Sequence, residues 1–192
     1  HWSSPCVNMG VVLGRLAKQS LALDAYADAL EREPGNPVAY FNLGTTLRQM
    51  GRLEDAAGAL EDLLDLDPAF PRVRLALANV LGELELLDRA RQLLEEELEE
   101  EPDNAACWSS LGLVHVCNGD AEQGEQCLLQ ALELDPYHFN AIQNLINLYV
   151  TLNRRQEARA LLELARQLDP GRTDRILASG PQFGALAELS PE

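Results

Sequence analysis

Apolar residues along this chain recur at intervals of three and four, a spacing that places them on one face of an α-helix. Such stretches come in pairs, and each pair ends at a Glu-Pro or Asp-Pro step. Proline cannot continue a helix, and it moves the residue before it out of the helical conformation. The pattern therefore predicts an all-α chain built from helical hairpins.

The hairpins recur with a fixed period. The prolines that end the five hairpins follow one another at intervals of 34 residues: Pro34, Pro68, Pro102, Pro136 and Pro170. Aligned on these prolines, residues 3–172 divide without insertion into the blocks 3–36, 37–70, 71–104, 105–138 and 139–172. A constant period of this length indicates a tandem repeat architecture. We expect residues 173–192 to add a capping helix and a tail, the helix starting at the cap residue Thr173 and stopping before Gly180.

Small and large residues keep the same register in the blocks. The eighth position reads Gly10, Gly44, Ala78, Gly112 and Ile146, and the twentieth reads Ala22, Ala56, Ala90, Gly124 and Ala158. We expect two helix backbones to touch at these small residues. Large core residues are predicted at the seventh position, Met9, Leu43, Leu77, Leu111 and Leu145, and at the twenty-fourth, Tyr26, Leu60, Leu94, Leu128 and Leu162. Gly51 and Gly119 mark turns between the two helices of a hairpin.

This pattern resembles the tetratricopeptide repeat (TPR) over all five blocks. The resemblance implies a right-handed superhelical solenoid in which the first helix of each repeat lines a concave groove. Arg74 and Glu97 depart from the family pattern within the third block, at positions where the family prefers apolar residues. We expect them to form an ion pair, because a lone carboxylate in that seam would be costly; the alternative is that both reach solvent along their stems.

Composition narrows the choice of function. The net charge is −16 and the pI about 4.5, which argues against nucleic acid as a partner, since phosphates require clustered Lys and Arg. The sequence contains no run of about 20 apolar residues, which would predict a membrane-spanning helix, and no signal peptide is evident. Cys107, Cys117 and Cys127 are ten residues apart, so we expect buried free thiols rather than metal ligands. The lack of a compact disulfide framework favours a cytoplasmic location.

No catalytic motif or cofactor-binding motif appears, so we expect neither an enzyme nor a cofactor. The family resemblance instead implies a peptide-binding groove, lined at positions two, five, six, nine, twelve and thirteen of each repeat. Those positions carry three Arg and one Glu, with amides and hydroxyls between apolar residues. Carboxamides donate and accept hydrogen bonds, so they suit a peptide backbone. The predicted binding residues are Asn8, Arg15, Phe41, Asn42, Thr45, Arg48, Arg72, Asn79, Asn144 and Asn147.

The sixth position supplies a partial asparagine ladder, Asn8, Asn42 and Asn144, interrupted by Ala76 and Ser110. Such a ladder resembles the repeat domain of O-linked N-acetylglucosamine transferase, where it holds the peptide backbone. The alternative reading is that Asn simply suits exposed positions near a helix start. The Lys, Asn and Arg pattern with which chaperone-binding members hold a C-terminal carboxylate is not reproduced. Arg15 and Arg48 would still favour an acidic residue at one rim.

We therefore expect a non-catalytic scaffold or adaptor that binds a peptide or protein partner in its groove. Two alternatives remain at this stage. One is the substrate-recruiting arm of a larger enzyme such as a glycosyltransferase. The other is self-association through the N-terminal end, where only two residues precede the first block and its outer face has no cap.

Overall fold

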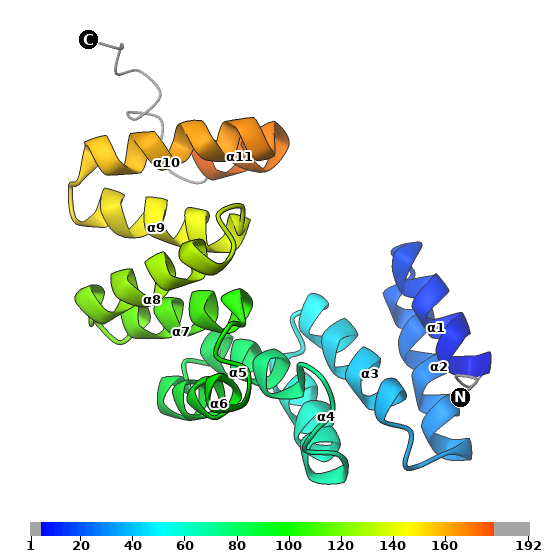
Figure 1. The fold of residues 1–192 in the computed structure, drawn as a ribbon. Coiled ribbons are helices and arrows are strands. Elements are labelled where there is room, and N and C mark those ends of the chain that lie inside the picture. The colour runs from blue at the N-terminus through cyan, green and yellow to red at the C-terminus, as the bar shows by residue number, and fades with distance from the viewer. Residues whose placement is uncertain (1–4, 179–192) are drawn as a thin grey trace. The chain divides into compact units, whose positions relative to one another are not determined.

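The computed structural model of the chain describes residues 5–178. This part is all-α, as predicted, and its helices follow one another through short connections without an intervening strand (Figure 1). Eleven helices make up the described residues: α1 (Pro5–Arg15), α2 (Gln19–Arg32), α3 (Pro37–Gln49), α4 (Leu53–Leu66), α5 (Val73–Glu83), α6 (Leu87–Glu100), α7 (Ala105–Cys117), α8 (Ala121–Leu134), α9 (Phe139–Thr151), α10 (Arg155–Leu168) and α11 (Pro170–Ala178).

The helices form two compact units, the N-terminal unit His1–Leu93 and the C-terminal unit Leu94–Glu192, which meet within α6. In the N-terminal unit α1 packs on α2 and α3 on α4, while α2 also contacts α3 and α4 contacts α5. In the C-terminal unit α7 pairs with α8 and α9 with α10, and α8 contacts α9. Each unit is therefore a series of antiparallel hairpins stacked on their neighbours in the sequence. Arg74 and Glu97 fall in different units, so their ion pair stays a prediction.

The connection inside each hairpin has one backbone form. The second residue after the first helix has a positive φ in all five hairpins, between 56° and 86°: Ala17, Gly51, Glu85, Gly119 and Asn153. The turns predicted at the two glycines are confirmed. The other three side chains adopt a left-handed conformation that costs a non-glycine residue about 1 kcal/mol. The hairpin geometry therefore overrides local residue preference at these sites.

The predicted close approach of paired helices is confirmed at the glycines of the eighth position. A Cβ on Gly44 would lie 2.7 Å from Cγ of Leu60, and one on Gly112 would lie 2.7 Å from Cγ of Leu128. Ile146 takes the same slot in the α9–α10 hairpin and is fully buried, so that pair accommodates a large side chain. The small residues thus set how near the two helices of a hairpin can lie.

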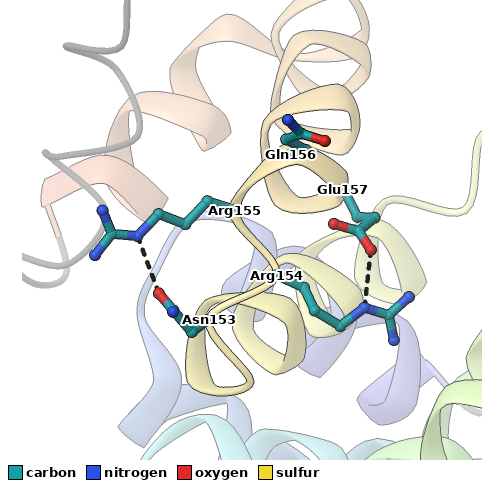
Figure 2. A pocket seen from close by; sticks show the side chains of 5 residues that line it. All are labelled: Asn153, Arg154, Arg155, Gln156 and Glu157. Carbon is teal, nitrogen blue, oxygen red and sulfur yellow. Dashed lines mark hydrogen bonds and ion pairs between the residues drawn. The ribbon is translucent and has the colours of Figure 1, made fainter.

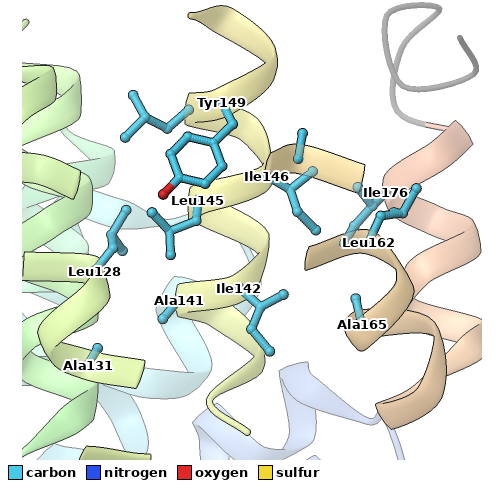
Figure 3. Packing of buried hydrophobic residues seen from close by; sticks show 12 residues of the cluster. Leu128, Ala131, Ala141, Ile142, Leu145, Ile146, Tyr149, Leu162, Ala165 and Ile176 are labelled. Atoms are coloured by element: carbon cyan, nitrogen blue, oxygen red, sulfur yellow. The ribbon is translucent and has the colours of Figure 1, made fainter. Parts of the chain in front are cut away.

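The cores are strips between neighbouring hairpins. In the C-terminal unit, Leu128 and Ala131 of α8 lie in one cluster with Ile142 and Leu145 of α9 (Figure 3). All five residues of the twenty-fourth position are buried, as predicted: Tyr26, Leu60, Leu94, Leu128 and Leu162. The corresponding prediction for Met9 is wrong, because its side chain is 57% exposed. Leu43 and Leu145 of the seventh position pack against residues of the preceding hairpin, and the described residues place no hairpin before α1.

The last helix begins earlier than predicted. α11 starts at Pro170, and Oδ1 of Asp169 accepts a hydrogen bond from the Arg172 amide N–H at 2.9 Å. Asp169 is thus the cap, and proline suits the first helical position because it lacks an N–H. Thr173 is not the cap: it is fully buried inside the helix, and its hydroxyl donates to the Asp169 carbonyl oxygen. Gly180, the predicted stop, lies outside the described residues.

Candidate functional site

Acidic residues are distributed unequally between the two helices of each hairpin. The first helices, α1, α3, α5, α7 and α9, contain a single acidic residue, Glu83. The second helices, α2, α4, α6, α8 and α10, carry between two and six acidic residues each. The negative charge of the chain therefore lies away from the helices that were predicted to bind a ligand.

On α3 the predicted binding side chains use part of their hydrogen-bonding capacity within the helix. Nδ2 of Asn42 donates to the Val38 carbonyl oxygen at 2.8 Å, and the Thr45 hydroxyl donates to the Phe41 carbonyl oxygen at 2.9 Å. Asn42 keeps its side-chain oxygen and a second N–H, while the Thr45 oxygen can still accept. This face of α3 can thus both donate to a ligand and accept from it.

Phe41 has a more structural position than the sequence predicts. It is half-buried, and its ring centroid lies 5.5 Å from that of Phe70, with the planes inclined at 42°. Tilted aromatic pairs at this separation are favourable. Phe41 therefore supplies an apolar wall beside Asn42 rather than a fully exposed anchor.

The cations predicted in the N-terminal unit differ in their surroundings. Arg48 on α3 forms an ion pair with Glu83 on α5, with Nη2 and Oε1 2.6 Å apart. Arg48 is therefore already neutralised and is a poor attraction point for an acidic ligand. Arg15, at the end of α1, is exposed and forms no ion pair with another described residue.

Arg72 does not lie on a first helix. It occupies the cap position of α5 with a φ of 67°, and the helix begins only at Val73. In α3 and α7 the residue before the helix is Asn36 or Asn104, whose side-chain oxygen accepts from a backbone N–H of the first turn. Phe70 holds the same repeat position as Asn36 and Asn104, and its side chain has no acceptor for a backbone N–H. The helix accordingly begins later, at Val73. The remaining predicted residues of this unit are exposed Asn8 on α1 and half-buried Asn79 on α5.

In the C-terminal unit the predicted residues lie on α9. Asn140, Asn144, Asn147 and Thr151 follow one another at intervals of four, three and four residues, so they share one helix face. Asn144 is half-buried and the other three are exposed. The Thr151 hydroxyl donates to the Asn147 carbonyl oxygen at 2.9 Å, which leaves the Asn147 carboxamide available. We call these four residues the α9 amide stripe.

An open recess of about 470 Å³ lies at the turn between α9 and α10, lined by residues 153–157 (Figure 2). Nε of Arg154 bonds Glu157 at 3.0 Å, and its Nη1 bonds Glu125 of α8 at 2.7 Å. The Tyr149 hydroxyl donates to the other Glu125 oxygen at 2.8 Å, and the guanidinium carbon lies 4.3 Å from the Tyr149 ring centroid. These charged groups are bonded to one another, so the network links α8, α9 and α10. It leaves few of its hydrogen-bonding groups available to a ligand.

The network also shifts proton affinities. The hydrogen bond from Arg154 lowers the pKa of Glu125. Burial, followed by the hydrogen bond to Glu125, raises the pKa of Tyr149 to about 12.

Sequence reasoning missed this site, although the sequence contains a signal for it. At this turn an Arg precedes an acidic residue by three positions both in Arg154/Glu157 and in Arg52/Asp55, and both pairs form ion pairs.

A second recess, of about 260 Å³, lies between α9 and α11. Gln143, Arg172, Arg175 and Ile176 line it. Gln143 directly precedes Asn144, which belongs to the α9 amide stripe. Gln143 also holds the fifth repeat position, one of the groove positions that the resemblance implies. The two arginines come from α11, whose side chains sequence reasoning did not assign to the site. α11 begins three residues before the expected start, so Arg172 lies within the helix and not before its cap.

The thiols differ in exposure. Among the described residues no cysteine forms a disulfide: Cys107 is buried, Cys6 and Cys127 are half-buried, and Cys117 is exposed. The expectation that the spaced thiols are buried is therefore wrong for Cys117, which is the last residue of α7. In residues 5–178 no three His, Cys, Asp or Glu side chains gather as a metal site. Nor is any helix there both long and apolar enough to cross a bilayer.

Comparisons with known proteins agree with the repeat pattern. Two family models, both described as tetratricopeptide repeat, match residues 20–80 and 47–114 for the first and 105–138 for the second. No curated protein sequence matches the chain significantly.

Solved structures resemble the fold over nearly the whole chain. TTC0263, a thermophilic TPR protein of Thermus thermophilus, is 23% identical with a TM-score of 0.80, covering 96% of this chain and 98% of that one. MamA 41-end of Desulfovibrio magneticus RS-1 is 21% identical with a TM-score of 0.72, covering 85% and 92%. YrrB, described as a TPR protein with an unusual peptide-binding site, is 20% identical with a TM-score of 0.65, covering 98% and 93%. With its stacked hairpins and the matching models, this chain belongs to the tetratricopeptide repeat family.

Proposed function

We propose that the chain binds an extended peptide segment of a partner protein along the exposed faces of its first helices. The observation that carries this proposal is the separation of charge from amides. The first helices are nearly free of acidic residues, and α3 and α9 present carboxamides and hydroxyls instead. A peptide backbone is neutral and offers alternating donors and acceptors, which is what such a face can pair.

The α9 amide stripe has dimensions that suit this role. At a rise of about 1.5 Å per residue, Asn140 and Asn147 are about 10 Å apart along the helix. An extended peptide covers that length with about three residues. Each hydrogen bond contributes about 1 kcal/mol net, so one stripe alone gives weak binding and several first helices must contribute.

YrrB gives independent support, since a protein of similar fold is described as having a peptide-binding site. The asparagine ladder makes the proposal specific to residues. Asn42 on α3 and Asn144 on α9 hold the same repeat position, and both retain hydrogen-bonding capacity that is not used within the described chain. Asn8 is the exposed member of the set on α1.

The test is a selection from a random peptide library on the immobilised full chain, followed by Kd measurements with the enriched peptides. The groove variant replaces Asn8, Asn42 and Asn144 by Ala. The control variant replaces three exposed amides of second helices, Gln123, Gln126 and Gln167, by Ala. We expect the groove variant to bind at least about tenfold more weakly, since two or more hydrogen bonds are lost, and the control to bind like the parent chain.

Two outcomes would contradict the proposal. One is a library that yields no enriched peptide on the parent chain. The other is an equal loss of affinity in the groove and control variants, or no loss in either. Circular dichroism of each variant establishes that a lost affinity does not come from a lost fold.

A further inference from the structure

The recess between α9 and α11 combines a cavity with positive charge. It has a volume of about 260 Å³ and is lined by Gln143, Arg172, Arg175 and Ile176. Ile176 is buried and gives the recess an apolar side, while the other three side chains supply N–H donors. A ligand that fills it needs an acceptor group on a short apolar stem.

Arg172 is held in place without being neutralised. Its guanidinium carbon lies 3.9 Å from the centroid of the Phe139 ring, and its Nη2 donates to Oδ1 of Asn140 at 2.9 Å. Stacking on an aromatic ring fixes the plane of a guanidinium and leaves its edge free to bond. The carboxamide of Asn140 is neutral, so the positive charge of Arg172 remains.

Arg175 lies three residues further along α11, and its side chain makes only a long hydrogen bond, 3.3 Å, to the Gly171 carbonyl oxygen. Within residues 5–178 neither Arg172 nor Arg175 forms an ion pair, whereas Arg48, Arg52, Arg89, Arg91, Arg154 and Arg166 each do. Arg172 and Arg175 therefore keep their positive charge in a chain of net charge −16.

The acids near this recess do not compensate the arginines. α9 has no charged residue at all. Oδ1 of Asp169 accepts from the backbone N–H of Arg172, as the cap of α11. Asp174, on α11 between the two arginines in sequence, is exposed and forms no ion pair with a described residue. Gln143 also lines the recess and makes no hydrogen bond to another described side chain, so its carboxamide is available to a ligand.

We propose that this recess is a carboxylate subsite of the peptide groove, in which Arg172, Arg175 and Gln143 hold a carboxylate and Ile176 contacts its stem. This rests on the proposed function, because Arg172 bonds Asn140 of the α9 amide stripe and Gln143 adjoins Asn144. A peptide lying on the stripe therefore passes the mouth of the recess. Guanidinium groups pair with carboxylates through two parallel hydrogen bonds, which a neutral amide cannot match.

The carboxylate has two sources with the same chemistry, the side chain of Asp or Glu and a free C-terminus. Three small probes separate them: N-acetylglutamic acid α-amide, N-acetyl-alanyl-alanine and N-acetylglutamine amide. The first has only a side-chain carboxylate, the second only a terminal one, and the third none. Each is titrated into the ¹⁵N-labelled full chain while the Nε–H signals of Arg172 and Arg175 are followed by NMR.

We expect a saturable shift of both Nε–H signals with one or both carboxylate probes and none with the neutral probe. The probe that binds more tightly identifies the source. Arg175→Gln should weaken its Kd at least about fivefold, as for a lost charge-assisted hydrogen bond. The matched control is Arg166→Gln, which removes the same charge from an exposed position on α10 and should leave the Kd unchanged. Absence of a saturable shift, or equal weakening by the two variants, would overturn the subsite.

The probes are too short to span the α9 amide stripe, so the subsite and the proposed function fail separately. Saturable probe binding without any enriched library peptide would leave the subsite standing and contradict the peptide-binding proposal. Enriched library peptides together with no saturable probe binding would do the reverse.

Discussion

At Gly112 the backbones of α7 and α8 approach so closely that a side chain has no room. A Cβ there would lie 2.7 Å from Cγ of Leu128 and 2.9 Å from the carbonyl oxygen of Gly124. The leucine can rotate, but the backbone oxygen belongs to the partner helix and cannot move alone. Gly124 meets Gly112 from the other side, since a Cβ there would lie 3.0 Å from the Gly112 carbonyl oxygen, so the two glycines together set the spacing of this hairpin.

Gly112→Ala is expected to lower the free energy of unfolding by about 1–3 kcal/mol, because the two helices must separate. The measurement is urea denaturation followed by circular dichroism. Gly58→Ala is the matched control: Gly58 lies inside α4 with nothing within 4 Å of an added Cβ. It should stabilise by about 0.5–1 kcal/mol through helix propensity alone. If both variants change stability in the same direction, close approach is not what selects Gly112.

Individual residues were predictable where their surroundings repeat. The buried leucines of the twenty-fourth position and the glycines at the helix contacts have the same neighbours in each hairpin, so register alone identified them. Met9 and Arg72 lack those neighbours: no described helix precedes α1, and Phe70 cannot cap α5. The left-handed φ of Glu85 had no residue signal, since glycine marks that turn in only two of five hairpins.

At the scale of elements, helix type and order followed from the apolar periodicity and the prolines, whereas helix ends depended on caps. Asn36 and Asn104 place the starts of α3 and α7 where the repeat predicts them. Asp169 starts α11 before its expected cap, so that Arg172 lies within the helix, and Arg172 and Arg175 both line the recess beside α9. The repeat period could not predict that, because α11 does not keep the register of the five blocks.

The network at Arg154 joins α8, α9 and α10 and should make stability depend on pH. The pKa of Glu125 is lowered in the fold, chiefly by Arg154. This carboxylate therefore stabilises the fold fully above its unfolded pKa, near 4.5, and the contribution is lost as pH falls through the lowered value. We expect Arg154→Gln to have a lower thermal midpoint than the parent at pH 7, with the difference shrinking toward pH 3.

The control for that comparison is Arg52→Gln. Arg52 holds the same repeat position as Arg154 and pairs with Asp55. Its ion pair contains no carboxylate from another hairpin, unlike that of Arg154 with Glu125. Thermal unfolding by calorimetry at several pH values should show a smaller and flatter effect for Arg52→Gln. Equal effects for the two variants would mean that the contact with Glu125 adds nothing.

At the scale of the whole chain, α1 presents an apolar face that the other first helices bury. Met9, Val12 and Leu16 are 57%, 51% and 61% exposed, whereas Leu145 and Leu148, the α9 counterparts of Met9 and Val12, are buried. α1 has no acidic residue, so two copies can bring these faces together without opposing carboxylates. The sequence pattern predicted an uncapped surface here, and self-association through it stays a prediction.

Sedimentation velocity over a range of concentrations tests this association. The parent chain should shift to larger species as concentration rises, and more so at high salt, which screens the repulsion due to the net charge of −16. Met9→Gln with Val12→Gln should keep the chain monomeric. Leu129→Gln, at a 43% exposed leucine of α8, is the control and should associate like the parent. A parent chain that stays monomeric throughout would rule out the association.

The placement of nearly all helical carboxylates on the second helices gives each hairpin an electrical polarity. Charged ligands diffusing toward the chain feel the summed field of these acids before they touch any side chain. Cationic segments are drawn first to the second helices, while anionic ones are slowed at low ionic strength and gain access as salt increases. The rate at which a ligand meets the proposed binding faces is therefore expected to depend on the ligand's charge and on the ionic strength.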